Sequence, residues 1–216
     1  VRNYVAGDDI RNIDWKVTAR TQVTHSRVFS EEKEKPALIV VDQTKSMFFG
    51  SKNKTKAVVA AELAALMAFR VQKEGDRVGG VVFADRGTDI IFPKRDRKNI
   101  LRFLEKVVAR NHELKDSKPI EFEPAIPDLL SKVKNIVTHD FLIVVISDFH
   151  RYNPDVVKFI SNMAQHNNVI LAKVYDPFEK KGPEMKVVAG DGQKQLMLNG
   201  DDAKVRQKFR NSFEAE

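Results

Sequence analysis

Four side chains that carry oxygen atoms follow two apolar runs of the kind that form buried strands. They are Asp42, Thr44, Ser46 and Asp148. The first three come directly after the apolar residues 37–41, and the fourth follows the apolar residues 141–146. Carboxylate and hydroxyl oxygens are hard ligands, which suit Mg²⁺, Ca²⁺ or Mn²⁺ and do not select a soft metal. If the two strands are neighbours, the four side chains converge and form a candidate metal site.

The same residue types also have a purely structural use. Asp, Ser and Thr are common at strand–helix junctions, because they cap helices and satisfy the backbone of turns. Capping explains a single cluster well. Two clusters after two separate buried strands leave capping and metal binding about equally open.

The apolar pattern predicts the elements that must position these residues. Buried strands are predicted at residues 37–42, 78–83, 141–146 and 169–174, and a hairpin partner at 88–92. Helices are predicted at residues 55–74, 97–109, 124–134, 154–165 and 201–213. Short edge strands are expected within residues 177–200. This alternation indicates an α/β fold with a doubly wound, mostly parallel sheet and helices on both faces. Ligands of such sheets bind beyond the carboxyl ends of the central strands.

The chain is long enough for one large domain, and we expect a single domain over residues 1–216. Residues 1–36 are more polar and are expected to form an appended segment that ends in a strand at residues 22–30. Trp15, the only tryptophan, is expected to be a buried packing anchor. Asp14 and Arg20 are expected to form an internal ion pair.

The helix at residues 55–74 is apolar on most of its circumference. Leu66 and Phe69 are among the side chains expected to pack against the sheet with little exposure. The longest apolar-rich run, residues 57–71, is too short to cross a bilayer, and the chain opens without a visible signal peptide. We therefore expect no membrane segment in this chain.

The chain has a formal net charge of +7 and no cysteine. The missing cysteines exclude disulfides, thiolate zinc sites and cysteine nucleophiles, and they are compatible with a cytoplasmic location. The positive charge fits a solvated surface or an acidic partner, and no basic-aromatic motif of a nucleic-acid-binding module is present. Arg95, Arg97 and Lys98 form the densest basic cluster, which is the candidate docking patch for an acidic partner.

The oxygen cluster also resembles a known motif. Asp42-x-Thr44-x-Ser46 resembles the Asp-x-Ser-x-Ser signature of the metal-ion-dependent adhesion site of von Willebrand factor A domains, and Asp148 stands where that family's later aspartate would stand. Further stretches resemble the bacterial MoxR-associated family catalogued as domain of unknown function fifty-eight. They are residues 7–20 (GDDIRNIDWKVTAR), 75–79 (GDRVG), 146–149 (ISDF) and 176–179 (DPFE).

This second resemblance covers nearly the whole chain. It implies a von Willebrand factor A-like fold and a chaperone-like partnership with a MoxR-type AAA+ ATPase, in maturing a client protein or inserting a metal into it. The adhesion site also uses a threonine on a loop before the second apolar strand, and here Ile120 stands at the matching position. Glu121 or Glu123 can supply an oxygen instead. Without such a replacement we expect Mg²⁺ or Mn²⁺ to bind weakly or not at all.

The leading functional hypothesis is a protein–protein interaction module that is not an enzyme. A carboxylate of the partner would fill the open coordination position of a bound cation. The alternative is a metal-dependent phosphohydrolase with Asp42 as nucleophile or ligand. Against this alternative, Asp42 lacks a second aspartate two residues later, and no phosphate-binding loop, dinucleotide turn, zincin pair or nucleophile elbow is present.

Overall fold

The computed structural model describes residues 1–28, 35–116, 122–150, 154–182, 186–190, 195–199 and 202–215. The chain that we expected to be one domain with an appended segment divides into two compact units. The first is Val1–Glu34 and the second is Lys35–Glu216. Each unit is held by a different kind of contact, polar in the first and apolar in the second.

The first unit is small and polar. It contains strand β1 (Arg2–Asn3), a 3-10 turn (Ile10–Asn12), helix α1 (Trp15–Thr21) and strand β2 (His25–Ser26), and the two strands pair antiparallel. A strand was expected at residues 22–30. In the described part of that range, residues 22–28, only the two residues of β2 form a strand. Gln22 adopts a left-handed conformation with φ of 62° and ends α1, so the chain turns before it can extend.

Two expectations for the side chains of this unit were wrong. Trp15 is the first residue of α1 and is 68% exposed, because this unit gathers no buried apolar cluster against which the ring could pack. Asp14 forms its ion pair with Arg27, at 3.1 Å, and not with Arg20. The carboxylate of Asp14 also caps α1 by accepting a hydrogen bond from Val17 N.

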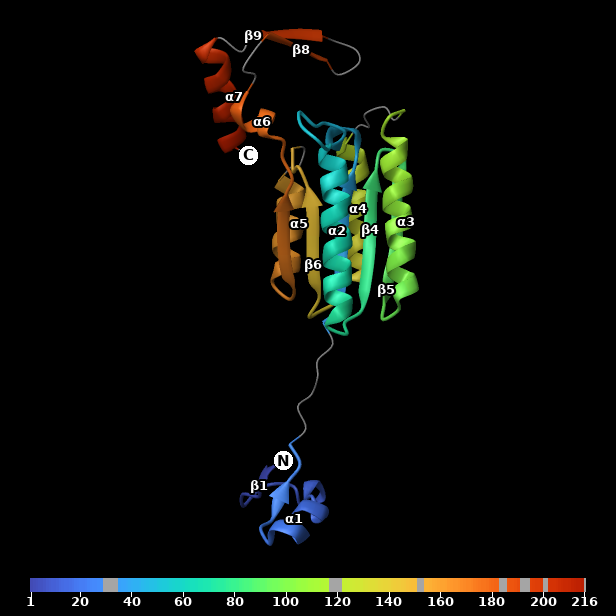
Figure 1. The fold of residues 1–216 in the computed structure, drawn as a ribbon, viewed down its shortest axis with the longest axis vertical. Coiled ribbons are helices and arrows are strands. Elements are labelled where there is room, and N and C mark those ends of the chain that lie inside the picture. Colours follow the sequence, from blue (N-terminus) through green and yellow to red (C-terminus); the bar gives the residue numbers. More distant parts are fainter. Residues whose placement is uncertain are drawn as a thin grey trace. The chain divides into compact units, whose positions relative to one another are not determined.

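The second unit is built on a five-stranded sheet (Figure 1). Its strands are β3 (Ala37–Gln43), β4 (Val78–Ala84), β5 (Gly87–Lys94), β6 (Leu142–Ser147) and β7 (Asn168–Lys173). The order across the sheet is β5-β4-β3-β6-β7, and only the β4–β5 pair is antiparallel. All residues of β3 and β4 are buried, which is why their sequences read as continuous apolar runs.

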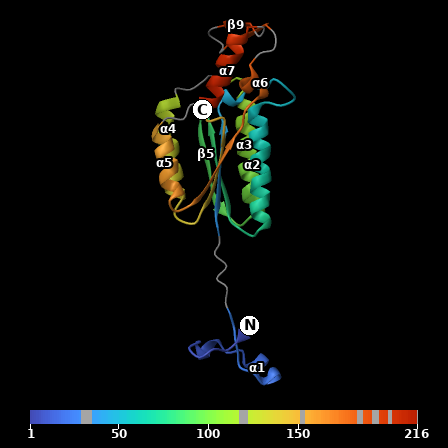
Figure 2. The same cartoon turned by 90° about the vertical axis from the view of Figure 1, so that its left-hand side faces the viewer.

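Helices cover both faces of this sheet, as the edge-on view shows (Figure 2). Helices α2 (Lys56–Lys73) and α3 (Arg97–Glu113) lie on one face, and α4 (Phe122–Ile136) and α5 (Pro154–Ala164) lie on the other. Each face has its own apolar core, with Ile39 and Phe103 in one and Leu38 and Ile143 in the other. The α/β fold class with a mostly parallel, doubly wound sheet is therefore confirmed.

Helix α2 packs differently from our expectation. Its sheet-facing residues are small, with Ala57, Ala60, Ala64 and Ala68 fully buried, so the helix lies close to the strands. Two of the larger side chains are turned outward, while Leu63 and Met67 are partly buried against the core. Leu66 is 69% exposed and Phe69 is 37% exposed, so the helix is buried along its alanine stripe and not around its circumference.

Strand β7 was expected to be buried, but it is the edge strand of the sheet. Ile170 and Leu171 are 46% and 52% exposed. The apolar run predicted the strand correctly, whereas its position in the sheet determines how much of it is covered.

The C-terminal part of this unit contains three further pieces of regular structure. They are helix α6 (Pro177–Lys181), an antiparallel pair of strands β8 (Lys186–Gly190) and β9 (Gln195–Asn199), and helix α7 (Ala203–Ala215). The carboxylate of Asp202 caps α7 by accepting from Lys204 N. Across the described part of the chain, no helix combines the length and apolarity needed to cross a membrane.

Candidate functional site

The candidate site lies where the winding of the sheet changes direction. Strands β3 and β6 are parallel neighbours, and Val41 is in register with Ile146, so the residues after them leave the sheet side by side. From β3 the chain continues to α2 on one face, and from β6 it continues to α5 on the other. The two connections separate at the carboxyl ends of these strands, which is the place where open α/β sheets bind ligands.

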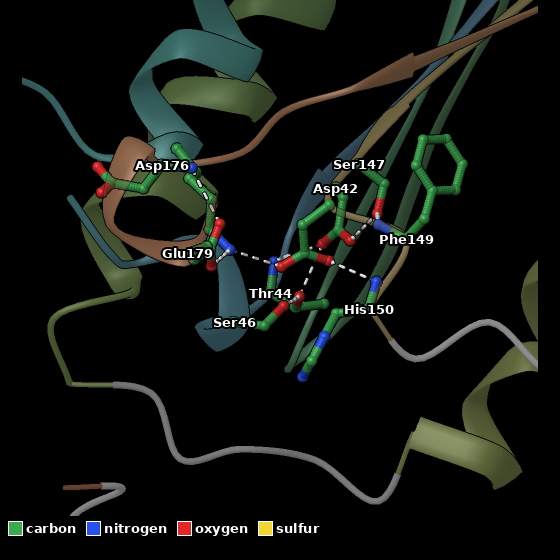
Figure 3. Close-up of polar contacts among 10 residues, drawn as sticks. Asp42, Thr44, Ser46, Ser147, Phe149, His150, Asp176 and Glu179 are labelled. Atoms are coloured by element: carbon green, nitrogen blue, oxygen red, sulfur yellow. Dashed lines mark hydrogen bonds and ion pairs between the residues drawn. The ribbon is translucent and has the colours of Figure 1, made fainter. Parts of the chain in front are cut away.

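Asp42 is the centre of a small hydrogen-bonded network (Figure 3). Its Oδ1 accepts hydrogen bonds from the backbone N of Thr44 at 2.9 Å and from Thr44 Oγ1 at 2.7 Å. Its Oδ2 accepts a hydrogen bond from Ser147 Oγ at 2.6 Å. The side chain is almost fully buried, with 4% of the residue exposed. The contact from Ser147 joins the ends of β3 and β6 directly.

Burial makes the charge on Asp42 costly. Desolvation, together with the nearby negative charge of Asp148, raises the pKa of Asp42 from 3.8 to about 6, although hydrogen bonds from Ser147 and Thr44 act in the opposite direction. Asp148 directly follows Ser147, whose hydroxyl binds Asp42, so the two carboxylates lie close together. A cation nearby would favour the ionised form of Asp42.

Thr44 and Ser46 supply the hydroxyl oxygens of the site. Their Oγ atoms lie 3.0 Å apart. Two adjacent ligands of an octahedral magnesium ion, each about 2.1 Å from the metal, are also about 3 Å apart. The two hydroxyls thus fit neighbouring direct ligands, while Asp42 and Asp148 fit a second shell that holds water molecules. Among the residues that the structure describes, no three carboxylate or imidazole side chains form a metal cluster, so the hydroxyls are essential to this donor set.

Asp148 is bound by a lysine that the sequence did not single out. Lys56 Nζ donates to Asp148 Oδ2 at 2.9 Å and to Glu179 Oε1 at 2.6 Å. The side chains of Lys56 and Asp148 are 4% and 7% exposed, whereas that of Glu179 is 34% exposed. The other oxygen of Asp148 accepts a hydrogen bond from the backbone N of His150. An ammonium group is therefore built into the edge of the site.

The charge on Lys56 depends on the two carboxylates that it binds. Burial of Lys56 acts to lower its pKa, but the carboxylates of Asp148 and Glu179 outweigh that effect and raise the pKa above its ordinary value. Lys56 is the first residue of α2, where the partial positive charge of the helix dipole adds to that of the ammonium group. Lys56 thus offsets the charges of Asp148 and Glu179, and Asp42 is the carboxylate of this group that has no lysine partner among the described contacts.

A third buried aspartate ties the loop before α2 to α6. Asp176 Oδ2 accepts from the backbone N of Ser51 at 2.8 Å, and Asp176 Oδ1 accepts from the hydroxyl of Ser51. Asp176 and Glu179 also form a capping box at the start of α6. The Asp-x-x-Glu spacing in the sequence predicts such a box, but it gives no indication that Glu179 also binds Lys56.

The turn after β6 has an unfavourable backbone conformation. Phe149 has a φ of 56°, which is uncommon for a residue with a side chain. Its N–H donates to Ser147 Oγ at 3.1 Å, so the hydroxyl that binds Asp42 also holds this turn. Such conformations cluster at functional sites, where the surrounding structure maintains them.

A cavity of about 130 Å³ lies beside Asp148. It is lined by Lys56, Asp148, His150, Lys173, Tyr175, Glu179, Phe209 and Phe213. The rings of Phe49, Phe178 and Phe209 pack in sequence, with centroids 5.9 and 6.0 Å apart, and connect the loop before α2 with α6 and α7. The C-terminal helices therefore form part of the wall of the site.

The structure brings together the four residues proposed as the metal site. Ile120 and Glu121 lie outside the described residues, and Glu123 lies in α4 in a part where side chains are not described. Arg95, Arg97 and Lys98 are exposed, as expected for a docking patch. They follow the end of β5 that pairs with Val78, at the amino end of β4. The basic cluster therefore lies beyond the amino ends of the parallel strands, whereas Asp42 lies at their carboxyl ends.

Comparison with solved structures finds distant likenesses. An aerotolerance-related membrane protein from Bacteroides fragilis is 14% identical, with a TM-score of 0.47, and the match covers 83% of this chain and 88% of that chain. The Rpn10 VWA domain is 13% identical, with a TM-score of 0.37, and the match covers 66% of this chain and 90% of that chain.

Sequence comparison finds closer relatives. Uncharacterized protein Mb1516 from Mycobacterium bovis is 37% identical over 81 residues, which are 38% of this chain and 26% of that protein. The match therefore spans about a quarter of the length of this curated relative. The family described as "Protein of unknown function DUF58" matches residues 1–216. Because this match covers the whole chain, the chain belongs to the DUF58 family.

Proposed function

We propose that this chain is a protein-recognition module whose site at the ends of β3 and β6 binds a divalent cation and, through it, a carboxylate of the partner. The observation that carries the proposal is the convergence of two carboxylates and two hydroxyls at the switch point of the sheet. These side chains are Asp42, Asp148, Thr44 and Ser46. The resemblance of this motif to the adhesion site of von Willebrand factor A domains supports the same assignment.

Each residue has a distinct part in this proposal. Thr44 and Ser46 would hold Mg²⁺ or Mn²⁺ directly, and Asp42 and Asp148 would hold its water molecules. The bound cation supplies an open coordination position for an anionic group. Because Ile120 stands where the adhesion site uses a threonine, with Glu121 and Glu123 as candidates for a replacement oxygen, we propose that the isolated chain binds metal weakly and that a partner carboxylate strengthens the binding.

We further propose that the partner is a MoxR-type AAA+ ATPase, with a chaperone-like role in protein maturation or metal insertion in the cytoplasm. Support comes from membership of the DUF58 family together with the resemblance of four sequence stretches to the MoxR-associated family. The chain contains no cysteine, which is compatible with this location.

The environment of Asp42 gives no support to the phosphohydrolase alternative. A nucleophilic carboxylate must present a lone pair to its substrate. Asp42 is 4% exposed and accepts three hydrogen bonds, two on Oδ1 and one on Oδ2. Such a group is better suited to organising a site than to attacking a phosphate.

The proposal is tested by calorimetric titration of the chain with a MoxR-type ATPase, in Mg²⁺ and in excess chelator. We expect Thr44→Val, which removes the hydroxyl but keeps the shape, to abolish the gain in affinity that Mg²⁺ gives. Thr44→Ser is the matched control, because it keeps the oxygen and should keep the gain. Equal affinity of the native chain in Mg²⁺ and in chelator would contradict a metal-dependent contact.

A further inference from the structure

A hollow with an unusual charge lies between α6 and α7, close to the candidate site. Its volume is about 510 Å³, and it is lined by Lys180, Lys181, Arg210 and Phe213. We call these four residues the α6–α7 basin. All three cationic side chains belong to exposed residues. The two helices pack against each other, with the ring centroids of Phe178 and Phe209 6.0 Å apart, so the cations from α6 and α7 are held close together.

The positive charge of the basin is not compensated within the described structure. Among the residues that the structure describes, no carboxylate lines the hollow. Lys180 Nζ and Lys173 Nζ lie over the ring of Phe213, at 5.9 and 4.8 Å from its centroid. Among the described residues, neither Lys181 nor Arg210 pairs with an acidic side chain. Gathering like charges around one ring raises the local positive potential, which attracts an anionic partner.

The basin adjoins the candidate site, whereas the basic cluster on α3 does not. Phe213 lines both the basin and the cavity beside Asp148. The cluster of Arg95, Arg97 and Lys98 lies at the start of α3, beyond the amino ends of the parallel strands. Helix α3 has 17 residues, which corresponds to a length of about 25 Å. The basin is therefore the nearer of the two basic surfaces to the candidate site.

We propose that the α6–α7 basin is the docking surface for an acidic segment of the protein partner, a stretch of chain with several Asp or Glu side chains. This inference rests on the proposed function, because it concerns the same partner. The cations come from two helices and surround an open hollow, which suits several charges spaced along an extended chain. The basin's lining consists of flexible side chains rather than the backbone N–H groups that form a compact phosphate nest.

The test uses a fluorescein-labelled hexaglutamate peptide and measures its anisotropy with the full chain in chelator. The variant Lys180→Gln/Lys181→Gln/Arg210→Gln removes three exposed cations from the basin. The matched control, Arg95→Gln/Arg97→Gln/Lys98→Gln, removes three exposed cations from the start of α3. Each exposed ion pair is worth about twofold in affinity, so we expect the basin variant to lose roughly tenfold and the control less than twofold. The loss should shrink at high salt.

Several outcomes would overturn the inference. Equal losses in both variants would show a response to net charge alone, and a larger loss in the control would move docking to α3. Binding to phosphatidylserine vesicles without binding to the peptide would assign the basin to a membrane surface. Asp42→Asn should leave peptide binding in chelator unchanged. That result separates this inference from the proposed function. A failure of metal dependence would contradict the metal site and leave the basin unaffected, and a failure of peptide binding would contradict the basin and leave the metal site unaffected.

Discussion

Lys56 links two carboxylates that are 92 and 123 residues away from it in the sequence. Such a buried pair is expensive to break, because removing one partner leaves the other charge in a low-dielectric site. Glu179 is partly exposed and can turn to water, whereas Asp148 cannot. The main consequence of losing Lys56 is therefore an unpaired charge on Asp148.

We predict that Lys56→Met lowers the free energy of unfolding by about 3–5 kcal/mol, as expected for breaking a buried ion pair. Lys54→Met is the matched control. Lys54 forms an ion pair with Glu62 at 2.6 Å, but both side chains are about half exposed, at 51% and 53%. Exposed pairs contribute about 0–1 kcal/mol, so this control should change little. The measurement is urea denaturation of both variants, and equal effects would contradict the buried pair.

Asp42 gives a prediction about pH. Folding raises its pKa from 3.8 to about 6, so between these values the folded chain binds the proton more tightly than the unfolded chain. The stability that this proton contributes is fully present below about pH 4 and is lost as the pH rises through 6. The shift corresponds to about 3 kcal/mol in total.

The measurement compares the native chain with Asp42→Asn, which cannot titrate, in metal-free buffer containing chelator. The free energy of unfolding of the native chain, relative to the variant, should fall by about 2.4 kcal/mol between pH 4 and 7, most of the total. The comparison removes the contribution of the other titrating groups. A constant difference across this range would mean that Asp42 does not titrate in the folded chain.

At the scale of elements, the packing of α3 against β4 depends on a missing side chain. A Cβ atom at Gly80 would overlap the ring of Phe103, which is 1% exposed in the core. We predict that Gly80→Ala destabilises the chain by about 1–3 kcal/mol through overpacking. Phe103→Leu in the same chain should recover part of this cost, since the shorter side chain frees the space. Thermal unfolding of both single variants and the double variant measures the coupling, and simple additivity would argue against the overlap.

Most of the strands and helices could be predicted from the sequence for a physical reason. Strands buried on both faces must be apolar throughout, so β3, β4 and β6 appear as continuous apolar runs. An apolar run does not show whether its strand lies in the middle or at the edge of the sheet. For this reason β7, which is an edge strand, was expected to be buried. An apolar run also does not show which side of an apolar helix faces the sheet, and in α2 the alanines do so while Leu66 faces outward.

The candidate site was predictable only where it is local. Asp42 is the penultimate residue of β3, Thr44 and Ser46 come just after that strand, and Asp148 directly follows the neighbouring strand β6. The spacing of residues within a strand and the parallel register then bring them together. Lys56 and Glu179 come from α2 and α6, and their meeting depends on how distant segments pack. No spacing in the sequence indicates that contact.

At the scale of the whole molecule, the two compact units differ in how they are held together. Both apolar cores consist of residues from the second unit alone, starting at Ala37. In the first unit, Ser26 is the only buried residue among those described. Chains shorter than about 40 residues rarely fold alone without a disulfide, a metal or a partner. A peptide of residues 1–34 is below this length and has no cysteine.

We therefore predict that a chain of residues 35–216 folds by itself, with the cooperative unfolding of the full chain, while a peptide of residues 1–34 is largely unstructured. Circular dichroism and urea denaturation measure both. Trp15 provides an independent reading on the full chain, because it is the only tryptophan and is 68% exposed. Acrylamide should quench its fluorescence nearly as well in buffer as in urea, and strong protection in buffer would contradict this exposure. If residues 35–216 alone lost cooperative unfolding, the apolar cores of the second unit would not be sufficient for folding and the first unit would have to contribute to stability.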